Sequence, residues 1–299
     1  MKKSARLVLI CLFLFSFTII GAAAPAGQVV GDTSLLDTSF SKGILIHTAD
    51  WFAAHPLKAG DPTRGDNAFK SPRVQVDLVT NKGPLIGLHY HASADEIVYV
   101  AKGQGEMYID GQWKPVKAGE LHINPRGVVH ATRVTGNDVM LVIGFFTPPQ
   151  AYGNDKVFVD KSFDGKVIGN EALIEGKNDT GLLIDLDEWY AAHPLKAGDA
   201  TRGDNAYASS RAKVDFVTNK GPLIGRHHHS SCEEIVFVYK GQGEMYIDGQ
   251  WVPVKAGDLH INPRGVIHAT RVVGDDEMQV FCIFSPPQAN GNDKIFLDQ

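Results

Sequence analysis

The chain contains the same unit twice, and this repeat constrains the fold more than any other feature of the sequence. Trp51 corresponds to Trp189, so the two copies are offset by 138 residues. The offset stays constant, without insertion or deletion, along the whole of 43–160 and 181–298. Self-similarity at one fixed offset is typical of duplicated structural units. We therefore predict two domains of one fold, at 43–160 and 181–298, joined by a linker at 161–180.

Each copy has the pattern of an all-β domain. Residues 74–79 alternate between apolar and polar side chains, as in a half-buried strand. Turn signals such as Asp110-Gly111 separate the apolar runs, and the chain has 31 glycines and 15 prolines. The strands expected in the first copy are 74–79, 96–100, 106–109, 121–124, 128–134 and 139–146. Many short strands with frequent turns predict a barrel or sandwich, with one helix near 49–55 capped by Asp50.

The first 26 residues have the pattern of an export signal. Basic residues precede an apolar run at 7–20, and small residues then lead to Ala26. The alternative is an uncleaved anchor, because this run is barely long enough to span a bilayer. We predict a signal peptide at 1–26 and an exported protein, periplasmic or secreted, with no membrane association after cleavage.

The charge and the cysteine content of the chain exclude some classes of partner and one kind of fold. Removing the basic residues of the leader takes the net charge from −5 to about −8. The remaining chain has no basic block, which argues against nucleic acid as a partner. Three cysteines cannot build a disulfide scaffold. Cys232 and Cys282 follow the leader, and whether they pair is left open by the sequence.

The histidines of the first copy have the spacing of metal ligands. Side chains alternate along a strand, so His89 and His91 point to the same face, about 7 Å apart. Glu96 can enter from the neighbouring strand, and His130 can arrive from another strand after a Pro-Arg-Gly turn. Three imidazoles and one carboxylate suit a first-row divalent ion. The sequence therefore predicts a metal site in each copy.

These residues resemble the two motifs of the cupin family. The first motif, Gly-x5-His-x-His-x4-Glu-x6-Gly, occurs at 83–103 and 221–241. The second, Gly-x5-Pro-x-Gly-x2-His, occurs at 119–130 and 257–268. The resemblance implies an exported bicupin with two tandem β-barrels of the jelly-roll type and a metal in each. The implied ligands are His89, His91, Glu96 and His130, and His227, His229, Glu234 and His268.

The resemblance leaves the reaction open, because cupin barrels host many activities. It implies up to two divalent ions per chain, with Fe(II) or Mn(II) expected and zinc or nickel left open. The leading expectation is a metalloenzyme of oxygenase or decarboxylase type, with lyases and isomerases as neighbours, acting on a small oxygen-rich acid or diol. The alternatives are a non-catalytic exported protein that binds a sugar or small acid, and a pair of barrels of which one is purely structural.

The sequence also predicts where several residues beside the implied ligands lie. Strand alternation turns His228 away from the ligand face, so we predict that it is not a ligand. Four polar residues in matched positions either line the cavity near the metal or face solvent, and both interpretations stay open. They are His122, Asn124, His260 and Asn262.

One face of the last strand differs between the copies. Val139 and Leu141 are apolar in the first copy, whereas Glu277 and Gln279 occupy these positions in the second. Apolar residues on an otherwise solvated face are typical of a covered surface. We therefore predict that this face contacts the other domain or a second copy in a homodimer.

Overall fold

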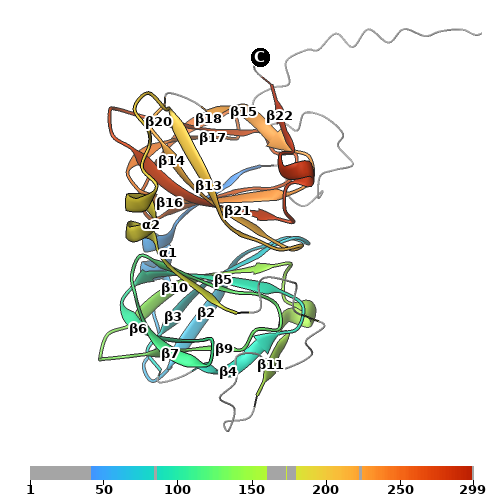
Figure 1. Ribbon diagram of the computed structural model, residues 1–299. Helices are drawn as coiled ribbons and strands as arrows, with labels where there is room; N and C mark the ends of the chain where they lie inside the picture. The colour runs from blue at the N-terminus through green and yellow to red at the C-terminus, as the bar shows by residue number, and fades with distance from the viewer. Residues whose placement is uncertain (1–41, 84–85, 160–172, 174–179, 222–223, 298–299) are drawn as a thin grey trace, which may run out of the picture.

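The computed structural model describes residues 42–83, 86–159, 173, 180–221 and 224–297. Two β-barrels stack one above the other (Figure 1), each built from a six-stranded and a five-stranded sheet with antiparallel pairing. This confirms the predicted all-β fold with two tandem barrels. The signal peptide predicted at 1–26 lies outside the described residues, as does nearly all of the predicted linker.

The first barrel consists of two sheets that face each other. Its six-stranded sheet contains β2 (Thr63–Lys70), β3 (Gln75–Asn81), β5 (Asp95–Lys102), β8 (Glu120–Asn124), β10 (Met140–Thr147) and β12 (Leu182–Asp185). Its five-stranded sheet contains β4 (Ile86–His91), β6 (Gln104–Ile109), β7 (Gln112–Lys117), β9 (His130–Val134) and β11 (Lys156–Phe158).

The second barrel repeats this arrangement. Its six-stranded sheet contains β1 (Ile44–His47), β13 (Thr201–Ala208), β14 (Lys213–Asn219), β16 (Glu233–Lys240), β19 (Asp258–Asn262) and β21 (Met278–Ser285). Its five-stranded sheet contains β15 (Ile224–His229), β17 (Gln242–Ile247), β18 (Gln250–Lys255), β20 (His268–Val272) and β22 (Lys294–Phe296).

Two short helices follow the first strand of each repeat, α1 (Thr48–Ala54) and α2 (Leu186–Ala192). The cap predicted for α1 is wrong: Asp50 lies inside its first turn, and His47 at the N-cap position makes no capping bond. In α2, Asp185 accepts hydrogen bonds from two backbone N–H groups of the first turn, as an N-cap does. Across the described ranges, no helix is long and apolar enough to cross a bilayer.

The two repeats exchange their first strands. β1 of the first repeat pairs with β19 in the second barrel, with Ile44 opposite Ile261. β12 of the second repeat pairs with β8 in the first barrel, with Leu182 opposite Ile123. The boundaries 43–160 and 181–298 thus separate the repeats along the sequence, but at these strands they do not separate the barrels.

An apolar core joins the six-stranded sheets of the two barrels. The rings of Tyr99 and Phe237 lie 4.6 Å apart between centroids, and those of Phe145 and Phe281 lie 6.1 Å apart. All four side chains are buried in one continuous cluster. Alternation along β10 turns Leu141 toward this same side, where it is partly buried but is not among the side chains that form or pack against the core. The face that carries Leu141 is therefore the one that holds the interdomain core, while a contact of Val139 and Leu141 with the other domain or with a second copy stays a prediction.

Buried ion pairs also cross from barrel to barrel. Asp95 is completely buried, and its carboxylate accepts from the Tyr207 hydroxyl at 3.0 Å and the Ser209 hydroxyl at 2.6 Å. The Arg211 guanidinium lies 2.8 Å from the same carboxylate. The matching carboxylate, that of Glu233, is also completely buried and lies 3.5 Å from Arg73 of the first repeat. Each barrel therefore neutralises a buried acid of the other.

Candidate metal centres

Four predicted ligands of the second copy meet inside its barrel. His227 and His229 come from β15, Glu234 comes from β16 and His268 comes from β20. All four are buried, and one ligand atom from each lies within 4.8 Å of the others. The antiparallel register places His227 directly opposite His268. Strand pairing thus brings together residues that are up to 41 positions apart in the sequence.

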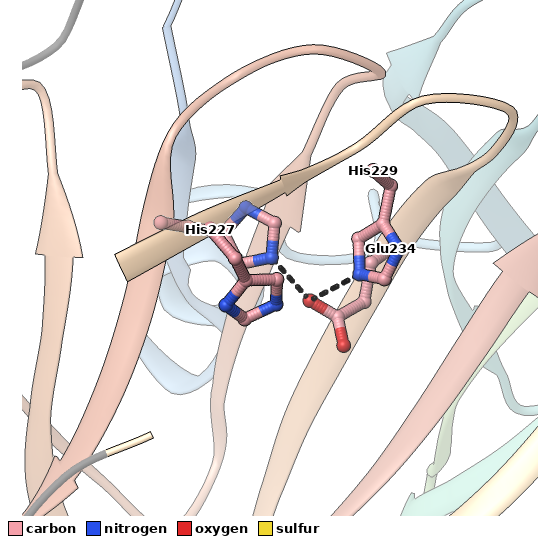
Figure 2. A group of neighbouring side chains, drawn as sticks. His227, His229 and Glu234 are labelled. Carbon is pink, nitrogen blue, oxygen red and sulfur yellow. Dashed lines mark ion pairs between the residues drawn. The ribbon is translucent and has the colours of Figure 1, made fainter. Parts of the chain in front are cut away.

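The carboxylate of Glu234 reaches between the imidazoles (Figure 2). Its Oε2 lies 2.9 Å from Nε2 of His268 and 3.9 Å from Nε2 of His229. The rings of His227 and His268 are 4.4 Å apart between centroids. Nitrogen and oxygen donors therefore converge on one point from three strands.

The outer ring nitrogens fix the tautomers of these histidines. Nδ1 of His227 lies 2.7 Å from the carbonyl oxygen of Gly225, and Nδ1 of His268 lies 2.9 Å from that of Val266. A carbonyl oxygen can only accept, so each Nδ1 carries a proton, and in the neutral form of each ring Nε2 keeps its lone pair. Nε2 of His227 is buried without a hydrogen-bond partner, and Nε2 of His268 contacts only the carboxylate of Glu234 among the interactions described above. Buried, unpartnered lone pairs that converge fit a divalent ion as their missing partner.

An aspartate supports the remaining histidine. Nδ1 of His229 donates to Oδ1 of Asp293 at 2.6 Å, and Asp293 also accepts from the backbone N–H of Ser231 at 2.8 Å. A carboxylate behind a ligating imidazole orients the ring and increases its basicity. Asp155 holds His91 at the same distance in the first barrel. Sequence reasoning missed both aspartates, although Gly-Asn-Asp-Lys occurs in both copies, at 153–156 and 291–294.

Burial and charge set the protonation states of the donors in the second barrel. Burial, followed by the neighbouring His268, lowers the pKa of His227 to about 2, so this ring is neutral. Burial alone would raise the pKa of Glu234, but His268 and His229 hold it well below the usual range. The centre therefore offers a neutral imidazole at His227 and an ionised carboxylate at Glu234, the forms that bind divalent metals.

The first barrel has a similar centre. Nitrogens of His89, His91 and His130 lie within 4.8 Å of one another. The carboxylate of Glu96 is 2.9 Å from Nε2 of His130 and 3.8 Å from Nε2 of His91. All eight residues that the two motifs single out are thus gathered at two centres, four at each.

The four polar residues left open by the sequence are buried. His122, Asn124, His260 and Asn262 are each 1% exposed, which excludes the solvent-facing interpretation. Nδ2 of Asn262 donates to Oε2 of Glu234 at 3.2 Å, and Nδ2 of Asn124 donates to Oε2 of Glu96 at 2.9 Å. The two asparagines therefore orient the carboxylate of each centre.

The remaining candidates are not among the eight predicted ligands. His228 is 1% exposed but stays outside the cluster of ligand atoms in its barrel. Cys232 and Cys282 are both buried and free, so they do not pair. Sγ of Cys232 lies 3.5 Å from the carboxylate of Asp293, and Cys282 is one wall of the cavity described next.

A cavity of about 380 Å³ opens onto the centre of the second barrel. His227, Glu234 and His268 form part of its lining. Its apolar walls are Val217, Ile224, Val236, Val280, Cys282 and Phe284, and its polar walls include Asp215, Asn219, Thr270, Gln288 and Lys294. In the first barrel, a hollow of about 60 Å³ between Pro62 and Val134 has no histidine in its lining. A hollow of about 440 Å³ beside His47 is lined by none of the candidate ligands.

Comparison with known families decides the identity of the fold. A cupin-domain family model matches 78–146 and 215–284, the segments that contain the eight candidate ligands. The chain belongs to the cupin superfamily. Its two matched domains lie in tandem, so the protein is a bicupin.

One relative in sequence and two solved structures of similar fold show what this bicupin is similar to. Quercetin 2,3-dioxygenase from Bacillus subtilis is 22% identical over 234 residues, which cover 66% of this chain and 68% of that protein. A cupin 2 conserved barrel domain protein from Leptotrichia buccalis has a TM-score of 0.56 at 16% identity, covering 81% of this chain and 96% of that chain. A variant of salicylate 1,2-dioxygenase from Pseudoaminobacter salicylatoxidans, in complex with gentisate, has a TM-score of 0.59 at 12% identity, covering 81% and 82%.

Proposed function

We propose that this bicupin is an exported metalloenzyme of oxygenase or decarboxylase type. Its substrate is a small oxygen-rich acid or diol, and its working site lies in the second barrel with Fe(II) or Mn(II). The observation that carries the proposal is a complete His₃Glu donor set that opens directly onto a cavity of about 380 Å³. This volume lies within the range of small-molecule sites. The similarity to quercetin and salicylate dioxygenases supports the oxygenase class.

The residues of the second barrel have distinct tasks in this proposal. His227, His229, Glu234 and His268 hold the ion, which supplies a Lewis acid and, in the case of iron, a redox centre. Asp293 and Asn262 keep the donors in orientation through the hydrogen bonds described above. The apolar walls lower the polarity around the donors, which strengthens electrostatic contacts inside the cavity.

Metal loading followed by an activity panel tests the proposed function. After anaerobic loading with Fe(II) or Mn(II), we expect oxygen uptake or CO₂ release with at least one small acid or diol. Combining His227→Ala with His229→Ala removes two of four donors, so activity should fall to background. The matched pair His89→Ala and His91→Ala should keep most of it.

Two outcomes would contradict the proposal. If the barrel 2 variant kept its activity, the working site would lie elsewhere. If no compound were turned over while the loaded protein bound one tightly, the protein would be a non-catalytic binder.

A further inference from the structure

The cavity of the second barrel contains a lysine beside the metal donors. Lys294 lies on β22, directly opposite His229, and Phe296 lies opposite His227. Residues opposite each other in an antiparallel pair share a face of the sheet. The rings of His227 and Phe296, 5.2 Å apart between centroids, show this shared face. Lys294 therefore extends its side chain from the ligand side of β22 and lines the cavity.

The ammonium group of Lys294 is a positive charge that acts on the carboxylate of Glu234 across this cavity. Asp215, the acidic wall residue, is already paired with Lys213 at 2.6 Å. Lys294 has no carboxylate within 4.0 Å among the residues that the structure describes. Its field nevertheless reaches the centre: burial and His268 lower the pKa of His227 most, and the positive charge of Lys294 lowers it further.

We propose that Lys294 binds the carboxylate of the substrate, so that the second barrel takes a small organic acid in preference to a neutral diol or sugar. The charge balance supports this choice, because a divalent ion and Lys294 together carry three positive charges, which exceed the two negative charges of Glu234 and Asp293. A positive cavity with low-dielectric walls favours an anionic guest. The inference rests on the proposed function and adds the substrate class to the same site.

The first barrel offers a matched control. Lys156 occupies the corresponding position on β11, opposite His91. It is absent from the lining of the hollow described in the first barrel. Lys156→Met therefore removes the same side chain from the same strand position without touching the cavity of the second barrel.

Calorimetric titration of the Mn(II)-loaded full chain tests the inference without requiring turnover. The probes are pyruvate, benzoate and salicylate, each paired with its neutral amide. We expect at least one carboxylate to bind about 10-fold or more tightly than its amide, as for a charge-assisted hydrogen bond. Lys294→Met should abolish this preference at unchanged metal content, Lys294→Arg should retain it, and Lys156→Met should leave it unaltered.

The outcomes separate this inference from the proposed function. If no carboxylate outcompeted its amide, or if Lys294→Met kept the preference, Lys294 would not be the anion site. Turnover of a neutral diol by the wild type in preference to every carboxylate tested would overturn the inference and leave the enzyme proposal standing. Absence of turnover with the charge preference intact would overturn the enzyme proposal alone.

Discussion

Residues 180–299 expressed alone are expected to form a dimer in place of a monomer. In the full chain, β1 completes the sheet of the second barrel by pairing with β19, and the fragment lacks β1. Its own first strand, β12, normally pairs with the corresponding strand β8 of the other repeat. Since β8 and β19 are equivalent, β12 of each copy can pair with β19 of the other and rebuild the stacked barrels. A closed two-fold exchange of this kind is a low-cost route to a dimer.

Light scattering after size-exclusion chromatography measures the molar mass of the fragment. Two variants of the fragment test whether pairing of β12 causes the dimer. Ile184→Pro removes a backbone donor in the middle of β12, so it should abolish the dimer. Asp185→His places a histidine opposite Asp258, as His47 is in the full chain at 2.8 Å, and should tighten the dimer. A stably folded monomer of the unaltered fragment would contradict the exchange.

Arg211→Met is expected to destabilise the full chain by about 3 kcal/mol, because it leaves a buried carboxylate without its cation. Asp95 is completely buried, and Arg211 lies 2.8 Å from it across the barrel interface. The hydroxyls of Tyr207 and Ser209 remain as donors, so the loss should fall at the lower end for a broken buried pair. Urea unfolding of the metal-free protein, followed by circular dichroism, measures the change.

Two companion variants check the cause of this loss. Arg73→Met breaks the matching contact to Glu233, which is longer at 3.5 Å, and should cost less. Adding Asp95→Asn to Arg211→Met removes the uncompensated charge and should recover part of the lost stability. An unfolding midpoint of Arg211→Met equal to that of the wild type would show that the ion pair does not hold the barrels together.

The sequence predicted the fold and the donor set because both follow from local periodicity. Alternation within 74–79 and the turn at Asp110-Gly111 required only neighbouring residues, and the structure places strands at β3 and β6 as expected. The ligands from His89 to His130 were predictable from their spacing because each lies on a strand. Side chains alternate between the two faces of a strand, so the spacing determines the face to which each ligand points. The same alternation kept His228 out of the cluster.

The strand exchange was not predictable in this way. The first strands, β1 and β12, share two of four residues and the same apolar pattern, Ile-Leu-Ile-His and Leu-Leu-Ile-Asp, so their pattern suits a sheet edge of either barrel. Periodicity carries no information on which copy a strand joins. Asp293 and Lys294 were missed for a related reason: only the register of β22 against β15 shows that they reach the donors.

Elemental analysis of the purified and reloaded full chain tests the central claim most directly. Two His₃Glu centres predict up to two divalent ions per chain, with at least the second barrel loaded to stoichiometry. Combining His227→Ala with His229→Ala should remove one ion per chain, while the matched His89 and His91 variant should keep the ion of the second barrel. A wild-type protein that holds no stoichiometric metal after loading with Fe(II) or Mn(II) would contradict the assignment of both centres.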